Sequence, residues 1–386
     1  MRRSAALIAL AALACSGDDA ASPASLAITF DGRAERGSTI ALHAIRSGTE
    51  ISPASLEWTV VPEAAALITG AGTATLLDTG TLSFRATDNA SANTAASGSR
   101  TLHVAAPPNI LFDMHDTITD TVRNGNRNIY RVALDGRDLV RLTSGGGDNI
   151  HPTSSADGSA IIFTSFRTNS ATLFSVSSRG SSEAPLPGMP ATSTDAAFAT
   201  TGGAFAFVGP LNGSPSLWVS SGEGAAATPV PGSSSAAIVA SPAWCMGGDS
   251  LVIVTTAFSN AALYLESSTT GQGRLLTNAS SFDVEPACSS DGGSIAFAST
   301  RDGGVGLYEL RSQSGSSVAQ RLDTMPANDG QPAWLPDGRI VFVSAVGTDS
   351  AHLAWLDPEV GRSATRIPIT GGGAPGHPTY FRGSAP

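Results

Sequence analysis

The chain has 386 residues and a formal net charge of −10, and all 22 of its basic residues are arginine. The absence of lysine excludes Schiff-base, P-loop and serine–lysine chemistry, and no Gly-x-Ser-x-Gly segment marks a hydrolase nucleophile. An acidic chain without a basic stripe also argues against nucleic acid as a partner.

Residues 1–14 have the pattern of an export signal, because Arg2 and Arg3 precede an apolar run that is too short to span a bilayer. The segment from Ala12 to Ser16 resembles a bacterial lipobox around Cys15, with alanine at position 12 where leucine is usual. The resemblance implies cleavage before Cys15 and lipidation of that residue. The protein would then be held in the bacterial cell envelope, at the outer membrane and facing the periplasm or the cell surface. The alternative is an ordinary secretory signal that ends near a cysteine.

Residues 15–23 are small and polar and are predicted to form a flexible tether. Residues 24–107 then contain short runs in which apolar and polar residues alternate, as in a small β-sandwich. The runs are 26–30, 40–45, 56–60, 75–77, 82–86 and 102–104. Trp58 in the third run, followed by the segment 80–86, resembles a bacterial immunoglobulin-like domain. Such a domain usually acts as a spacer.

Residues 108–386 contain one phrase six times. It begins at Pro152, Ala197, Pro242, Pro286, Pro332 and Pro378, at intervals of 45, 45, 44, 46 and 46 residues, and most copies end in a turn pair such as Asp157-Gly158. A period of about 45 residues is typical of a β-propeller blade, which is one four-stranded sheet. Each phrase is followed by a β-rich run, then an aliphatic and an aromatic residue, then a lone apolar residue, and this order predicts four strands per unit.

The two ends of this array complement each other. No strands follow the sixth phrase at Pro378, whereas the runs 110–112, 129–130 and 142–143 precede the first phrase without a phrase of their own. The last strand is therefore predicted to complete a blade whose other three strands are N-terminal, which removes open sheet edges. The expected fold is all-β, with a small sandwich followed by a six-bladed propeller that is closed by strand exchange between the N- and C-terminal segments.

The phrase resembles the TolB-type propeller repeat, also called the WD40-like or PD40 repeat. The similarity covers about residues 109–386 and is strongest at 331–338 and 285–292, while the second phrase lacks both the proline and the aspartate. Propellers of this type serve as protein-binding modules, peptidase caps or, rarely, lyases. The resemblance therefore implies a scaffold and not one activity.

The residue before each phrase is predicted to face the mouth of the central channel. These residues are His151, Ala196, Ser241, Glu285, Gln331 and His377, and ring closure would bring His151 and His377 together. We expect further polar residues near the same face, namely Asp113, His115, Asp116, Asp120, Asp148, Asp195, Asp283 and Asp329. Such imidazole and carboxylate groups could bind a divalent cation. The alternative is a wet channel lined by solvated polar residues.

Cys245 and Cys288 lie in the inner strands of neighbouring blades, at the third and the second position after the proline of their phrases. This offset should aim their side chains at opposite faces of the two strands. The sequence therefore predicts buried free thiols, with a disulfide as the alternative.

Two functions are compatible with these features. The first is a non-catalytic, envelope-anchored lipoprotein whose propeller binds a protein, a peptide or a glycan. The second is a metal-dependent polysaccharide lyase, because some oligogalacturonate lyases resemble this repeat and hold a metal through histidine and glutamine. Those enzymes need several histidines and a basic residue near the substrate carboxylate. The predicted mouth has two histidines and few arginines, which favours the binding function without a resident cofactor.

Overall fold

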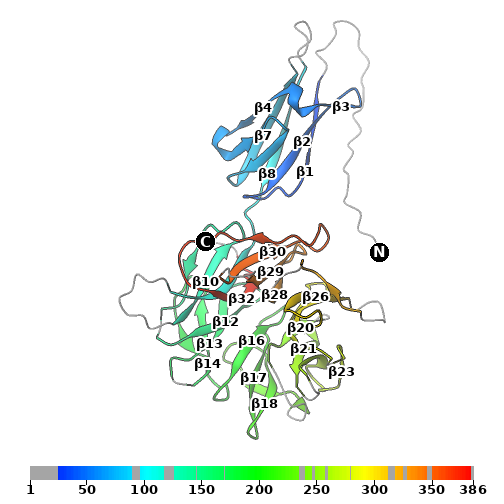
Figure 1. Cartoon of the computed structure of the whole chain (residues 1–386). Coiled ribbons are helices and arrows are strands. Elements are labelled where there is room, and N and C mark those ends of the chain that lie inside the picture. Colours follow the sequence, from blue (N-terminus) through cyan, green and yellow to red (C-terminus); the bar gives the residue numbers. More distant parts are fainter. Residues whose placement is uncertain are drawn as a thin grey trace. The chain divides into compact units, whose positions relative to one another are not determined.

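The structure is a computed structural model, which describes residues 25–88, 96–116, 126–144, 146–168, 170–233, 240–245, 248–256, 260–278, 280–311, 318–324, 328–345 and 350–383. The chain divides into two compact units, Met1–Ala106 and Pro107–Pro386, and strands make up nearly all the regular structure of both (Figure 1). Within the described ranges, no helix has the length and apolarity needed to cross a membrane. The predicted signal, the tether and Cys15 lie outside these ranges.

Two sheets build the N-terminal unit. One has the order β1-β2-β6-β5, with β3 also paired to β2, and comprises β1 (Ala27–Asp31), β2 (Thr39–Arg46), β3 (Thr49–Ile51), β5 (Ala66–Ile68) and β6 (Thr73–Leu76). The other has the order β4-β7-β8 and comprises β4 (Leu56–Val61), β7 (Gly80–Asp88) and β8 (Ala96–Val104). Two short 3-10 helices, η1 (Pro53–Ser55) and η2 (Glu63–Ala65), flank β4.

The two sheets share one core because apolar residues alternate along the facing strands. Ile40 and Leu42 of β2 join Leu82 and Phe84 of β7 in this core, and each is at most 1% exposed. The unit is therefore a β-sandwich. The strands β3 and β5 were not predicted, since three residues are too few to show an alternating pattern. The likeness of this sandwich to immunoglobulin domains stays a prediction.

Six four-stranded antiparallel sheets form the described part of the second unit, and we call them blades 1 to 6. Blade 1 has the order β11-β10-β9-β32, with β9 (Asn109–His115), β10 (Arg127–Ala133), β11 (Val140–Arg141) and β32 (Pro375–Tyr380). The other blades follow the chain from the inner strand outward. They are β12 (Asn149–Ser154), β13 (Ala160–Ser165), β14 (Thr172–Ser177) and β15 (Ala184–Pro185); β16 (Thr194–Phe198), β17 (Phe205–Leu211), β18 (Ser214–Ser220) and β19 (Ala227–Pro229); β20 (Ala243–Cys245), β21 (Ser250–Thr255), β22 (Ala262–Ser267) and β23 (Gly273–Leu275); β24 (Asp283–Cys288), β25 (Ser294–Ser299), β26 (Gly306–Arg311) and β27 (Gln320–Arg321); and β28 (Asp329–Trp334), β29 (Ile340–Ser344), β30 (His352–Leu356) and β31 (Thr365–Arg366).

Blade 1 joins the two ends of the unit. The C-terminal strand β32 pairs with β9, so that Tyr380 lies opposite Ile110 and Pro375 opposite Met114. The same strand contacts β28 of blade 6 and β12 of blade 2, and these segments lie side by side (Figure 1). Phe381 follows directly and is 1% exposed, in a core cluster with residues of β9, β10, β13 and β14. Blade 1 therefore depends on residues from both ends of the propeller sequence.

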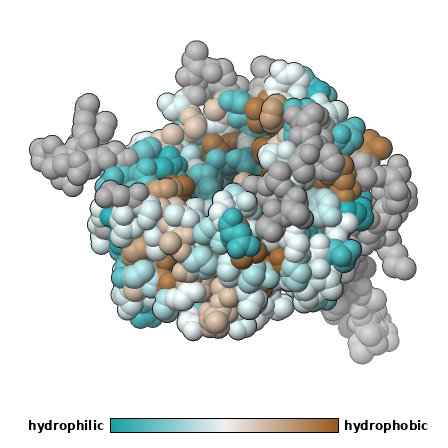
Figure 2. Space-filling view, turned by 90° about the horizontal axis from the view of Figure 1, so that it is seen from below, coloured by the Kyte–Doolittle hydropathy of each residue, from teal (hydrophilic) through white to brown (hydrophobic). Residues whose placement is uncertain are grey.

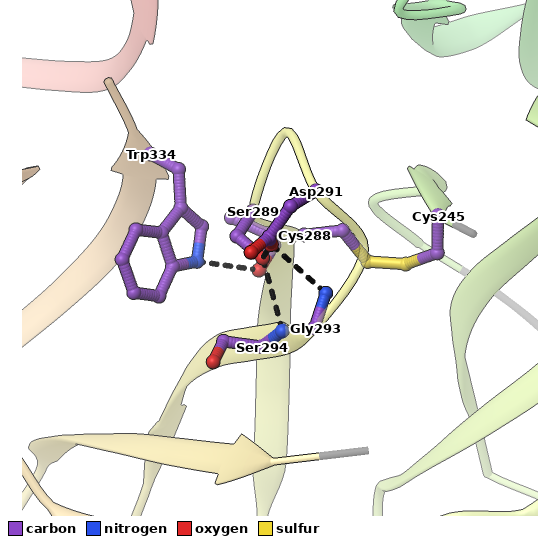
Figure 3. Close-up of a disulfide and its surroundings, with 8 residues drawn as sticks. Cys245, Cys288, Ser289, Asp291, Gly293, Ser294 and Trp334 are labelled. Atoms are coloured by element: carbon purple, nitrogen blue, oxygen red, sulfur yellow. Dashed lines mark hydrogen bonds between the residues drawn. A yellow bond between two sulfur atoms is a disulfide. The ribbon is translucent and has the colours of Figure 1, made fainter. Parts of the chain in front are cut away.

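Cys245 of β20 and Cys288 of β24 form a disulfide, with their Cα atoms 5.4 Å apart (Figure 3). This separation is usual for a disulfide. The prediction of free thiols is therefore wrong. It assumed that side chains on opposite faces of their own strands point away from each other. Neighbouring blades pack face to face, so the face of β20 that is turned toward blade 5 meets the opposite face of β24. An offset of one residue between two repeats brings such side chains together.

The packing of the C-terminal segment against blades 1 and 2 can be tested at Phe381. We expect Phe381→Ala to lower the free energy of unfolding by about 3–5 kcal/mol, because it empties a fully buried position in the cluster between blades 1 and 2. Phe282 is 56% exposed, and we expect Phe282→Ala to change stability by about 0.5 kcal/mol or less. Denaturant unfolding of both variants measures the difference. Equal stabilities would show that the C-terminal segment is not packed in this core.

Candidate functional site

The inner strands of the six blades surround a central cavity of about 480 Å³. Polar side chains line it where the inner strands begin, and small or aromatic residues line it further along these strands. The face of the molecule seen in Figure 2 has hydrophilic and hydrophobic residues interspersed among its coloured part, without one broad apolar patch. We therefore take the central cavity as the candidate site.

One residue at the start of each inner strand has a left-handed backbone. These residues are His151 (φ 54°), Asp195 (φ 53°), Ser241 (φ 53°), Glu285 (φ 55°), Gln331 (φ 55°) and His377 (φ 46°), and all six line the cavity. We call them the ring residues. In the five blades other than blade 4, each lies in a β-bulge where the inner strand shifts its register. Non-glycine residues in this region cost about 1–3 kcal/mol each and concentrate at functional sites.

Part of this geometry joins neighbouring blades. The backbone N–H of Gln331 donates a hydrogen bond to Glu285 Oε2 at 2.7 Å. The backbone N–H of His377 donates to the side-chain Oε1 of Gln331 at the same distance. A bulge that turns a backbone N–H sideways lets it reach the ring residue of the preceding blade. The ring residues therefore both line the cavity and link one blade to the next.

The ring residue of blade 3 is Asp195 and not Ala196, although Ala196 also lines the cavity as predicted. The register of β16 shifts between Thr194 and Ala197, so Ala196 takes the place that Pro152 has in blade 2. Gly202 likewise has the positive φ of Gly158, at 70° against 68°. The second phrase lacks its proline and aspartate, and without them the alignment slipped by one residue. The corrected ring has a carboxylate where an alanine was expected.

Ring closure brings the two ring histidines into contact. The imidazole centroids of His151 and His377 are 3.7 Å apart, with their planes at 76°. His151 Nδ1 is hydrogen-bonded to Asp195, and His377 Nδ1 lies 2.6 Å from Asp113 Oδ1. Asp113 is fully buried and also accepts hydrogen bonds from Arg127 and from the His151 amide. Each imidazole is thus oriented by its own carboxylate.

The charges of these groups depend on one another. Burial opposes protonation of His151, but its hydrogen bond to Asp195 and the charges of Asp195, Asp113 and Glu285 outweigh burial and raise the pKa of His151. Burial also opposes ionisation of Asp195, and the hydrogen bond from His151 overcomes it, so the pKa of Asp195 is lowered. The pKa of Asp113 is lowered in spite of burial by His377 and Arg127. The charged forms of His151 and Asp195 therefore stabilise each other at the cavity.

The structure groups five of the seven predicted ligand-binding residues around the cavity, namely His151, Ser241, Glu285, Gln331 and His377. His115 and Asp116 are not among the residues that line it, and their place at the channel mouth stays a prediction. They lie at the end of β9, which is the second strand of its blade, and Asp116 faces outward to Tyr130, Asn128 and Arg141. Asp113 is nearer to the ring than was predicted, through its bond to His377. Asp120 lies outside the described residues.

A metal centre has no obvious ligand set in the part of the chain that the structure describes. No group of three or more histidine, cysteine, aspartate or glutamate residues there has the arrangement to hold a metal ion. The Nδ1 atoms of His151 and His377 are both engaged by carboxylates. The ring can therefore accept or donate hydrogen bonds and carry charge, and these are properties of a binding site.

Beyond the ring, small residues line the cavity at one repeated position. The second residue after the ring residue is Thr153, Ala197, Ala243, Ala287, Ala333 or Thr379 in the six blades. The next residue is larger in most blades, with Phe198, Trp244, Trp334 and Tyr380 in blades 3, 4, 6 and 1. The indole Nε1 atoms of Trp244 and Trp334 donate to the carbonyls of Ala197 and Ala287, each in the preceding blade (Figure 3 shows Trp334).

Comparisons with known proteins agree with this architecture. Residues 189–367 match the TolB beta propeller domain family. The fold is similar to that of TolB from Acinetobacter baumannii, with a TM-score of 0.62 and 14% identity over 85% of this chain and 83% of that chain. It is also similar to a putative TolB from Agrobacterium tumefaciens (TM-score 0.54, 17% identity, 69% of this chain and 91% of that one) and to Kuenenia stuttgartiensis hydrazine synthase (0.55, 10%, 72% and 47%). The second unit of this chain has the fold of a TolB-type β-propeller.

The charge on His151 leads to a pH-dependent prediction. A histidine with a raised folded-state pKa adds stability that is complete below its unfolded value of about 6.5 and is lost as pH rises through the folded value. His151→Ala should therefore destabilise the protein by about 1.5–3 kcal/mol in mildly acidic buffer and by less at alkaline pH. Ser241→Ala is the control, because serine does not titrate and its effect should be the same at each pH. A loss for His151→Ala that does not change with pH would contradict the charged pair.

Proposed function

We propose that the protein is a non-catalytic binding scaffold of the bacterial cell envelope, in which the central cavity of the propeller takes up a segment of a partner peptide or protein. The observation that carries this proposal is the repeated small residue along the cavity wall. All six blades have alanine or threonine there, from Thr153 to Thr379. Larger side chains at this position would fill the cavity and bury more apolar surface. Small residues leave room for a ligand.

The ring residues support this proposal through their preorganisation. Their left-handed backbone conformation costs free energy that glycine would avoid. The same conformation directs six side chains toward the cavity, which glycine could not provide. Hydrogen bonds such as that from Gln331 to Glu285 restrict these side chains before a ligand arrives. Groups held in this way lose little entropy on binding. A peptide suits such a site because its N–H and C=O groups can pair with the ring.

Ala287 offers a direct test of the cavity. We expect Ala287→Phe to abolish capture of peptides selected from a random linear peptide library against the parent protein, because the phenyl ring would fill the cavity beside Trp334. The melting temperature should change by only about 2–4 °C, since the substitution enters empty space. Ala184→Phe adds the same group on the exposed outer strand β15 and is the matched control.

Two results would contradict the binding function. One is equal peptide capture by Ala287→Phe and the parent. The other is release of unsaturated uronides from polygalacturonate by the parent, which would indicate the lyase that the sequence left open.

The anchoring part of the proposal rests on the sequence of residues 1–16. A lipidated Cys15 followed by a small, polar tether would hold the folded units at a membrane through acyl chains. We expect Cys15→Ala to move the protein from the detergent phase to the aqueous phase in a phase-partitioning assay of cells that process lipoproteins. The parent is the control, and equal partitioning of both forms would contradict lipidation.

A further inference from the structure

A second cavity, of about 420 Å³, lies between the outer strands of blade 4 and the segment that leaves blade 3. It is lined by Pro231, Gly232, Tyr264, Glu266, Thr270, Gly271, Gln272 and Gly273. Residues 270–272 belong to the hairpin between β22 and β23, and Pro231 follows β19. A Cβ atom on Gly271 would come within 1.6 Å of the Pro231 carbonyl oxygen, so the two backbones are in close contact. This cavity is separate from the central one.

Glu266 is the unusual residue of this cavity. It is 2% exposed, and its Oε1 atom has no hydrogen-bond partner among the described residues. Burial raises the pKa of Glu266 to about 7. The nearest arginine in the sequence, Arg274, lies opposite Leu265 on β23, so alternation turns it to the other face of the sheet. A buried carboxyl without a partner is strongly unfavourable.

The other five blades show that the fold does not require a carboxyl at this position. Glu266 pairs with Leu251 across β21 and β22, and the same register in the other blades contains Val132, Val176, Ser220, Leu310 and Leu356. Each of these residues is at most 2% exposed. Five repeats thus fill the site with an aliphatic or small residue, and blade 4 alone has an acid. A local departure of this kind points to a function.

We propose that the Glu266 cavity binds an organic cation that carries N–H donors, such as the ammonium or guanidinium group of a small molecule or of a partner side chain. A charge-assisted hydrogen bond to Glu266 would satisfy the unpaired oxygen. The hydroxyl groups of Tyr264 and Thr270 and the amide of Gln272 can complete the contacts. A bare Ca²⁺ ion fits less well, because it needs six to eight oxygen ligands and the cavity has one carboxylate.

Binding of two small amines tests the proposal, namely putrescine for the ammonium group and agmatine for the guanidinium group. We expect at least one of them to bind to the parent protein by calorimetry, and Glu266→Leu and Glu266→Gln to weaken that binding by about tenfold or more. Tetramethonium, in which both nitrogens of putrescine are trimethylated, keeps the two positive charges without N–H donors and should not bind. Glu309→Gln is the matched control, because Glu309 is a buried acid of β26 that is already paired with Ser294 and Arg311.

Stability supplies a second measurement that needs no ligand. Because the folded-state pKa of Glu266 lies above the ordinary glutamate value of 4.5, the parent loses stability relative to Glu266→Leu as pH rises from 4.5 through 7. Glu266→Leu should therefore melt at a higher temperature than the parent, and by more at alkaline pH. A variant less stable than the parent at every pH would show that the carboxyl has an internal partner. That result would overturn the proposal. So would a protein that binds neither putrescine nor agmatine, or one that binds Ca²⁺ but neither amine.

Discussion

The pairing of β32 with β9 is the contact on which the propeller domain depends. It completes blade 1, buries Phe381, and places β32 between β28 and β12. The same pairing brings His377 beside His151 and Asp113, which are more than two hundred residues earlier in the chain. The ring of polar side chains at the central cavity therefore forms only when both ends of the propeller sequence are in place. Stability and the candidate site share one constraint.

The bulge at the start of five of the six inner strands explains why the ring can serve two purposes. It turns a backbone N–H toward the preceding blade and a side chain toward the cavity, as at Gln331. The cost of the left-handed backbone is offset by hydrogen bonds between blades. A substitution in the ring can therefore affect both blade packing and ligand binding. Only a control within the same ring, such as Ser241, separates these two effects.

The repeats also make exceptions easy to recognise. Once the strand pairing aligns the blades, each position is compared with five equivalents inside the same molecule. The disulfide between Cys245 and Cys288 and the buried Glu266 both occur where blade 4 departs from its neighbours. The disulfide links blades 4 and 5 covalently, and Glu266 lies beside the contact between blades 3 and 4. Blade 4 therefore has chemistry on both of its faces that the repeat does not require.

The sequence by itself determined the all-β class, the four-stranded repeat and the TolB-type propeller, because period and alternation follow from local backbone geometry. It also predicted five of the ring residues, since a proline follows each of them. Only the tertiary structure decided on Asp195, because the weak second phrase could be aligned in two ways until β16 paired with β17. The contact between Cys245 and Cys288, the outward turn of Asp116 and the burial of Glu266 likewise depend on how blades pack against one another. Such packing is set by side chains far apart in the chain, which a local pattern does not record.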